Sequence, residues 1–224
     1  MQITAIDYLT ILGFAGIFLL LFAIAEIGYH WLKIDVNYTR KFVHVMTGII
    51  VMFFPFYFTS PINLVIICIS FFIALALSKR LHLMQSINAI DRKSRGSTLY
   101  PVVVIICYFI QYYLERYIYF FLPIMILALA DPAAEFVGRQ TNYRPYEIFN
   151  HKKTVAGSIG FFTVALITSL VGLYFITELK VWVLVCCSIV VALVTTISEA
   201  ISIKGYDNLV IPLTVVLVLY LFGI

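Results

Sequence analysis

The chain has 224 residues, of which 63% are hydrophobic and only 12% are charged, and its mean hydropathy is +1.05. Because an average soluble domain carries about twice that charged fraction, this composition excludes a soluble enzyme or a soluble binding module. The formal net charge of +4 is less informative than the distribution of the charges along the chain. We expect a single integral membrane domain over residues 1–224.

Eight apolar runs, separated by short polar segments, follow one another along the chain. A helix needs about 20 apolar residues to cross a bilayer, so the runs predict an all-α, polytopic membrane helix bundle with about eight transmembrane helices. The four cysteines all lie inside apolar runs, where we expect them to pack and not to form disulfides. The runs cover about 8–32, 42–58, 62–78, 98–113, 117–137, 155–177, 181–203 and 209–224.

The fifth run contains Asp131 followed at once by Pro132. A proline inside a helix removes a backbone hydrogen bond, whereas a proline at the first position of a helix is well tolerated. We therefore predict that this helix is broken at Asp131-Pro132 and restarts there, with Asp131 as the N-cap and with free N–H groups beyond it.

Positive charge is strongly biased towards alternate loops. All lysines and arginines except Arg116 and Lys180 follow the first, third, fifth or seventh run. Since positively charged loops remain in the cytoplasm, we predict that these four loops are cytoplasmic and that both termini lie on the opposite side. The residues are Lys33, Arg40 and Lys41; Lys79, Arg80, Arg92, Lys93 and Arg95; Arg139, Arg144, Lys152 and Lys153; and Lys204.

Three acids lie at or near the ends of apolar runs on this same side, namely Asp131, Glu199 and Asp207. An unpaired charge there is costly, so each acid requires either an ion pair with neighbouring basic residues or a bound cation. Mg²⁺ held by one or two carboxylates and by substrate phosphates would satisfy them. In the seventh run, polar residues at positions i, i+3, i+4 and i+7 predict one polar helical face directed into the bundle; they are Thr195, Ser198, Glu199 and Ser202.

Several small or basic residues have two interpretations. Gly138, Gly157 and Ser158 suit close helix packing, or they leave room for a nucleotide. Arg92, Lys93 and Ser94, ahead of Gly96, suit a loop whose backbone approaches an anion. Glu26 is most simply a polar residue near a helix end, and His44, one turn after Arg40, is more often structural than a base.

Five ordered motifs resemble those of the polyprenol kinase family, which contains phytol kinases, dolichol kinases and CTP-dependent diacylglycerol kinases. The resemblance covers about residues 40–212, and the short length and the last motif are most similar to the phytol kinase branch. One departure is Ala130, where many members have glycine before the aspartate. The motifs are R-K-F-V-H, D-R-K-S-R-G-S, D-P-A-A-E-F-V-G-R, K-K-T-V-A-G-S and E-A-I-S-I-K-G-Y-D-N-L-V-I-P.

The resemblance implies transfer of the γ-phosphate of CTP to the hydroxyl of a membrane isoprenoid alcohol, with Mg²⁺ or another divalent cation as cofactor. The motifs and the charge pattern together give the expected site. We expect Asp131, Lys153, Asp207 and Glu199 to be catalytic, with Asp131, Asp207 and Glu199 as metal ligands and with the base open among these acids. Nucleotide or phosphate binding is expected from Arg40, Lys41, Arg92, Lys93, Ser94, Gly138, Arg139, Lys152, Thr154, Gly157, Ser158 and Asn208, with support from His44 and Glu26.

Three other functions compete with this one. A CTP-dependent diacylglycerol kinase comes next, followed by a phosphatidate cytidylyltransferase, whose Asp…Gly-Arg…Lys-Lys-Thr layout is similar but whose characteristic ending is absent here. A non-enzymatic lipid transporter is the third, although such proteins place their sites near the bilayer midplane and often contain inverted repeats. No nucleic-acid partner is expected, and the sequence leaves the oligomeric state open.

Overall fold

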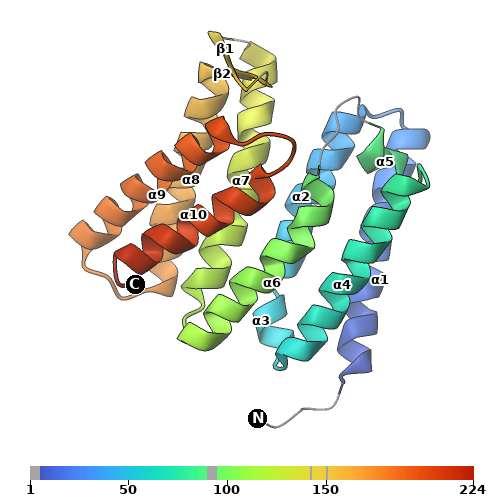
Figure 1. Cartoon of the computed structure of the whole chain (residues 1–224), viewed down its shortest axis with the longest axis horizontal. Coiled ribbons are helices and arrows are strands. Elements are labelled where there is room, and N and C mark those ends of the chain that lie inside the picture. The colour runs from blue at the N-terminus through green and yellow to red at the C-terminus, as the bar shows by residue number, and fades with distance from the viewer. Residues whose placement is uncertain (1–5, 90–94, 142, 150) are drawn as a thin grey trace.

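The computed structural model describes residues 6–89, 95–141, 143–149 and 151–224, and most of these residues are helical (Figure 1). The strands of the described residues are β1 (Pro145–Ile148) and β2 (His151–Thr154), which pair as a short antiparallel hairpin. The predicted all-α class is therefore confirmed. The helices are α1 (Tyr8–His30), α2 (Val36–Val51), α3 (Phe54–Tyr57), α4 (Pro61–Arg80), α5 (Gln85–Asn88), α6 (Gly96–Leu114), α7 (Ile118–Thr141), α8 (Val155–Ile176), α9 (Val181–Ile201) and α10 (Asp207–Leu221).

Each predicted apolar run forms a helix in the described part of the chain. Seven helical segments are long and apolar enough to cross a membrane, namely α1, α2 together with α3, α4, α6, α7, α8 and α9. The eighth, α10, has 15 residues, which at 1.5 Å per residue gives about 22 Å. The chain is thus an integral, multi-pass membrane protein.

Both ends of the described chain lie at the end of the bundle that is opposite the hairpin. The backbone N–H of Asp7 donates to Asn63, near the start of α4. The hydroxyl of Tyr119, at the start of α7, donates to the carbonyl of Ile224. The predicted count of about eight passes requires α10 to cross as well, and that count stays a prediction.

The predicted break at Asp131-Pro132 is wrong. Helix α7 continues from Ile118 to Thr141 with Pro132 inside it, and so neither an N-cap at Asp131 nor a free helix N-terminus exists there. Proline removes one hydrogen bond, and neighbouring helices make that loss tolerable in membrane proteins. Here α7 contacts α2, α6, α8 and α10, and more than half of its most apolar stretch is buried, so packing on several sides holds the helix together.

Helices α7 and α8 approach each other closely, and glycines make this approach possible. A Cβ atom added at Gly138 would lie 2.8 Å from the Thr154 hydroxyl, and one at Gly157 would lie 2.8 Å from the carbonyl oxygen of Ala134. Both distances are below van der Waals contact. The packing interpretation of these two glycines is therefore correct, and their predicted role towards a nucleotide remains a prediction.

The polar face predicted on the seventh run is also confirmed. Thr195, Ser198 and Glu199 are buried on α9, and so is Ser202, the residue that follows the helix. The polar loop expected before Lys152 contains the β1–β2 hairpin, in which Tyr146 pairs with Lys153 and Glu147 with Lys152. Period-2 alternation places the two lysines on opposite faces of the strand, and Lys152 is more exposed than Lys153.

Candidate active site

One cavity of about 640 Å³ is lined by charged side chains from α2, α7, α9, α10 and the hairpin. Its other walls are apolar residues of α1, α2, α4 and α6. The cavity therefore has a charged chamber near the hairpin end and an apolar arm that continues between the helices.

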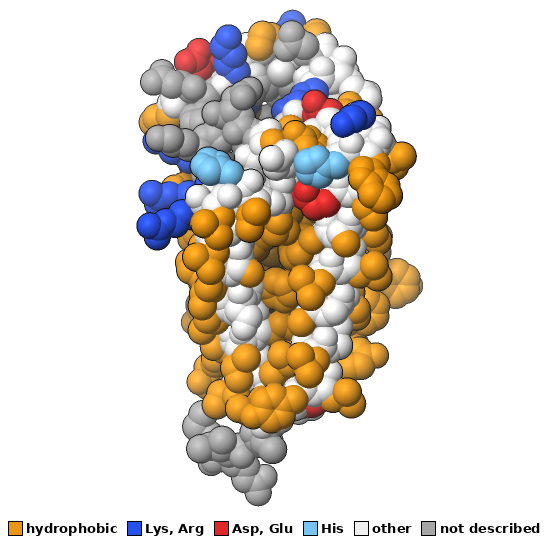
Figure 2. Space-filling view, turned by 90° about the vertical axis from the view of Figure 1, so that its right-hand side faces the viewer, with side chains coloured by type: hydrophobic (Ala, Val, Ile, Leu, Met, Phe, Trp, Pro, Cys, Tyr) orange, Lys and Arg blue, Asp and Glu red, His pale blue; other side chains and the backbone are white. Residues whose placement is uncertain are grey.

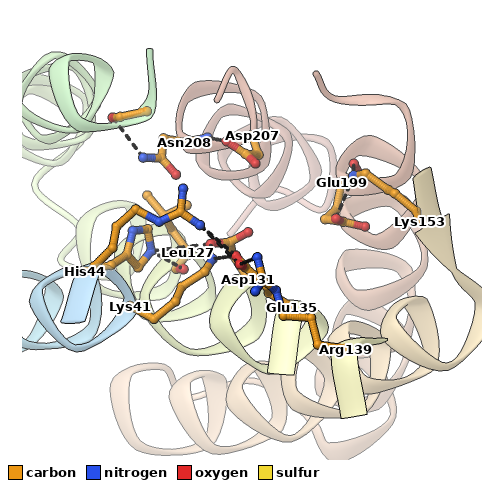
Figure 3. A network of polar contacts seen from close by, with 12 residues as sticks. Lys41, His44, Leu127, Asp131, Glu135, Arg139, Lys153, Glu199, Asp207 and Asn208 are labelled. Atoms are coloured by element: carbon orange, nitrogen blue, oxygen red, sulfur yellow. Dashed lines mark hydrogen bonds and ion pairs between the residues drawn. The ribbon is translucent and has the colours of Figure 1, made fainter. Parts of the chain in front are cut away.

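An ion-pair network between α2 and α7 forms one wall of the chamber (Figure 3). The Lys41 ammonium lies 2.5 Å from the Asp131 carboxylate and 3.0 Å from that of Glu135. Arg40 and Arg139 also bind Glu135, at 3.0 and 2.9 Å. Asp131 is only 7% exposed, so Lys41 compensates a charge that would otherwise be costly in this position.

His44 lies one helical turn beyond Arg40 and points at the same wall. Its Nε2 lies 2.9 Å from the carbonyl oxygen of Leu127 and 3.8 Å from the Asp131 carboxylate. Because a carbonyl oxygen only accepts hydrogen bonds, Nε2 is the donor. The ring packs edge-on against Tyr100, with 5.2 Å between centroids, and the Tyr100 hydroxyl is buried without a hydrogen-bond partner among the described residues.

Lys153 and Glu199 form a second charged pair, between β2 and α9. The Lys153 ammonium lies 2.6 Å from the Glu199 carboxylate and also donates to the Glu199 carbonyl. The next residue, Thr154, is the N-cap of α8, and its hydroxyl accepts a hydrogen bond from the N–H of Gly157 at 3.0 Å. The lysine is thus anchored at the point where the hairpin enters α8.

Asp207 and Asn208 bring the start of α10 to the same cavity (Figure 3). The Asn208 amide donates to the carbonyl of Gly96 at 2.9 Å, which fixes α10 against α6. The Asp207 carboxylate accepts from the backbone N–H of Asn208 at 2.9 Å. Within the described ranges it forms no ion pair, in contrast to Asp131, Glu135 and Glu199.

No group of three or more His, Cys, Asp or Glu side chains in the described residues is arranged to hold a metal ion. Mg²⁺ commonly uses one or two carboxylates together with phosphate oxygens and water. Asp131, Glu199 and Asp207 all line the cavity. Asp207 fits that requirement best, because it has no basic partner among the described residues, whereas Asp131 and Glu199 are paired with Lys41 and Lys153.

Most of the predicted site residues line this one cavity. Arg92, Lys93 and Ser94 lie outside the described residues. Glu26 does not line the cavity: it accepts hydrogen bonds from the N–H and the hydroxyl of Ser86, which connects α1 to α5. The predicted residues that line the cavity are Arg40, Lys41, His44, Asp131, Gly138, Arg139, Lys152, Lys153, Thr154, Gly157, Ser158, Glu199, Asp207 and Asn208.

Two residues of the chamber were missed by the sequence analysis. Glu135 binds Arg40, Lys41 and Arg139, and its place four residues after Asp131 puts it on the same helical face, a signal that was available. Tyr100 lies in an apolar run that gave no signal, because its position opposite His44 depends on how α6 packs.

The fold and the cavity define a polytopic helical membrane protein with a charged chamber at one end and an apolar arm leading away from it. Among curated proteins, the chain is similar to a phytol kinase of Synechocystis sp. (strain ATCC 27184 / PCC 6803 / Kazusa). The two are 27% identical over 176 residues, which are 78% of this chain and 75% of the relative. No family profile matches the chain, and no solved structure matches it. The similarity confirms the resemblance to the polyprenol kinase family at the level of the family.

Proposed function

We propose that this protein is a lipid kinase that transfers the terminal phosphate of a nucleotide to the hydroxyl of a membrane isoprenoid alcohol. The observation that carries the proposal is the single cavity that joins a charged chamber to an apolar arm. A substrate with a polar reactive end and an apolar tail matches both parts. The similarity to a phytol kinase supports the same class of reaction.

The charges of the chamber suit a polyphosphate. Among the described residues that line the cavity, seven are lysine or arginine and four are aspartate or glutamate. The positive excess favours an anion, and the acids provide positions for a cation beside it. Phosphoryl transfer depends mainly on positioning and charge neutralisation, and both are available in such a chamber.

Individual roles follow from the contacts. Asp131 and Asp207 would hold the divalent cation, which would neutralise charge on the transferred phosphate. Arg40, Lys41 and Lys153 would bind phosphate oxygens. Their ion pairs with Asp131, Glu135 and Glu199 keep these side chains in the chamber, and each basic residue would exchange its carboxylate partner for a phosphate oxygen when the nucleotide binds.

The donor nucleotide is proposed to be CTP, on the basis of the motif resemblance. The test uses the purified protein in detergent micelles with Mg²⁺, an isoprenoid alcohol and CTP labelled at the γ-phosphate, with ATP and UTP as alternatives. We expect a labelled lipid phosphate and CDP. Release of pyrophosphate would instead indicate a cytidylyltransferase, and a failure to consume any nucleotide would favour a transporter. Diacylglycerol in place of the alcohol tests the competing kinase.

A further inference from the structure

The apolar arm of the cavity has a definite depth. On α4 its lining residues run from Lys79 to Ile67, and on α2 they run from Lys41 to Val51. At a rise of 1.5 Å per residue, these distances are about 18 Å and about 15 Å. The arm therefore extends over roughly half of the hydrocarbon thickness of a bilayer, which is about 30 Å.

The arm ends against a packed group of phenylalanines. Phe54 lines the cavity, whereas Phe14 and Phe58 do not and lie behind it. The ring centroid of Phe54 lies 5.0 Å from that of Phe14 and 5.0 Å from that of Phe58. Phe54 is only 2% exposed and Phe58 only 1%. Because close-packed rings leave little free volume, the arm is closed at this end.

The side of the arm faces the surface that carries α1 and α4. Figure 2 shows this surface hollowed between two helical ribs, with hydrophobic side chains inside the hollow and charged side chains above it. Phe18 of α1 and Phe71 of α4 both line the cavity, and their ring centroids are 4.6 Å apart. Because these two rings pack against each other, an apolar molecule in the surrounding bilayer would have to move them apart to reach the arm through this hollow.

We propose that the arm holds the tail of the lipid acceptor and that Phe54 sets the longest tail that fits inside it. This inference rests on the proposed function, since the occupant is the tail of the alcohol whose hydroxyl lies in the chamber. A tail about as long as one leaflet is thick fits between the chamber and Phe54. A tail several times longer would have to leave through the hollow between α1 and α4.

The first test compares tail-length preference among variants with a series of isoprenoid alcohols of increasing length. Phe54→Leu deepens the arm by removing the ring that packs against Phe14 and Phe58. We expect the kcat/KM ratio of the next longer alcohol to the preferred one to rise about tenfold, as expected when a pocket gains room for a few methylene groups. Val104→Phe narrows the arm from α6 and should shift the preference to shorter tails by a similar factor. Phe120→Leu is the matched control, because Phe120 is 0% exposed but does not line the cavity.

The second test needs no phosphoryl transfer. An alcohol with a photoreactive diazirine at the end of its tail is bound in the absence of nucleotide, and the crosslinked peptides are identified by mass spectrometry. We expect crosslinks at Phe54 and at Val51 or Val104, and in Phe54→Leu a longer probe should reach Phe14 or Phe58. Crosslinks confined to α8 and α9, or a tail-length preference that is the same in all variants, would overturn the inference. Tail crosslinks at Phe54 without any lipid phosphate would instead overturn the kinase assignment alone.

Discussion

At Asp131, a buried carboxylate and a lysine from a different helix hold each other in place. A buried ion pair of this kind adds little net stability, because desolvation offsets most of the attraction. The pair does fix where both groups lie: Lys41 is held between Asp131 and Glu135, at 2.5 and 3.0 Å. The charges are therefore held in fixed positions, which is what the proposed phosphoryl transfer would require.

The first prediction concerns Asp131→Asn. The variant should remain folded, because Lys41 keeps Glu135 as a partner, but it should lose phosphoryl transfer by a factor of about 10²–10³, as typically follows removal of one preorganised electrostatic group. Initial rates with labelled nucleotide and thermal unfolding in detergent measure the two effects. The matched control is Asp35→Asn, at the exposed N-cap of α2, where asparagine caps equally well. If Asp131→Asn retained phosphoryl transfer, Asp131 would not be a metal ligand of the reaction.

The second prediction separates the contribution of Lys153 to stability from its contribution to activity. Lys153→Met leaves Glu199 unpaired at 8% exposure, so we expect a stability loss of about 3–5 kcal/mol together with a loss of activity. The double variant Lys153→Met/Glu199→Gln removes both charges and should recover most of the stability but not the activity. Lys152→Met, at the exposed neighbouring lysine, should leave the unfolding temperature unchanged. If the double variant recovered activity as well, Lys153 would have only a structural role.

At the scale of single elements, α7 carries three charged residues of the site on one continuous helix. Asp131, Glu135 and Arg139 follow one another at intervals of four residues, so that they lie on one face. A break at Pro132 would have turned the second half of the helix away from α2. The continuity of the helix is thus a condition for the ion-pair network, and packing by four neighbouring helices provides it.

The third prediction tests the approach of α7 to α8. In Gly157→Ala the new methyl group would meet the backbone carbonyl of Ala134 at 2.8 Å, which cannot move without shifting α7. We expect a loss of about 1–3 kcal/mol and a lower unfolding temperature. Gly16→Ala is the control: Gly16 lies in α1 with nothing within 4 Å of the added Cβ, so alanine should stabilise the helix by about 0.5–1 kcal/mol. Equal effects at both glycines would contradict the packing argument.

At the scale of the whole molecule, the arrangement brings loops from four separate places in the chain to one end of the bundle (Figure 1). The basic residues gathered there belong to the loops that follow odd-numbered passes. From the positive-inside rule we predict that this end of the bundle faces the cytoplasm.

The fourth prediction concerns this orientation. Single cysteines are introduced at opposite ends of the bundle, as Arg144→Cys just before the hairpin and as Glu178→Cys in the turn between α8 and α9. In intact cells or right-side-out vesicles, a membrane-impermeant maleimide should label Glu178→Cys only, and Arg144→Cys should react only after permeabilisation. The parent protein measures background from the native cysteines, of which Cys186 is exposed. The reverse labelling pattern would invert the orientation.

The sequence alone predicted where the long apolar helices lie, because a bilayer requires long apolar segments with internally satisfied backbones. It also determined that Asp131, Lys153 and Asp207 belong to one end, because charge excludes them from the apolar core. Only the tertiary structure decided that α7 continues through Pro132, since the stability of that helix comes from neighbours that are distant in sequence. Tertiary structure likewise decided the partners Lys41–Asp131 and Lys153–Glu199 and the closure of the apolar arm by Phe54. These features depend on contacts between helices far apart in the chain, which residue spacing within one helix does not specify.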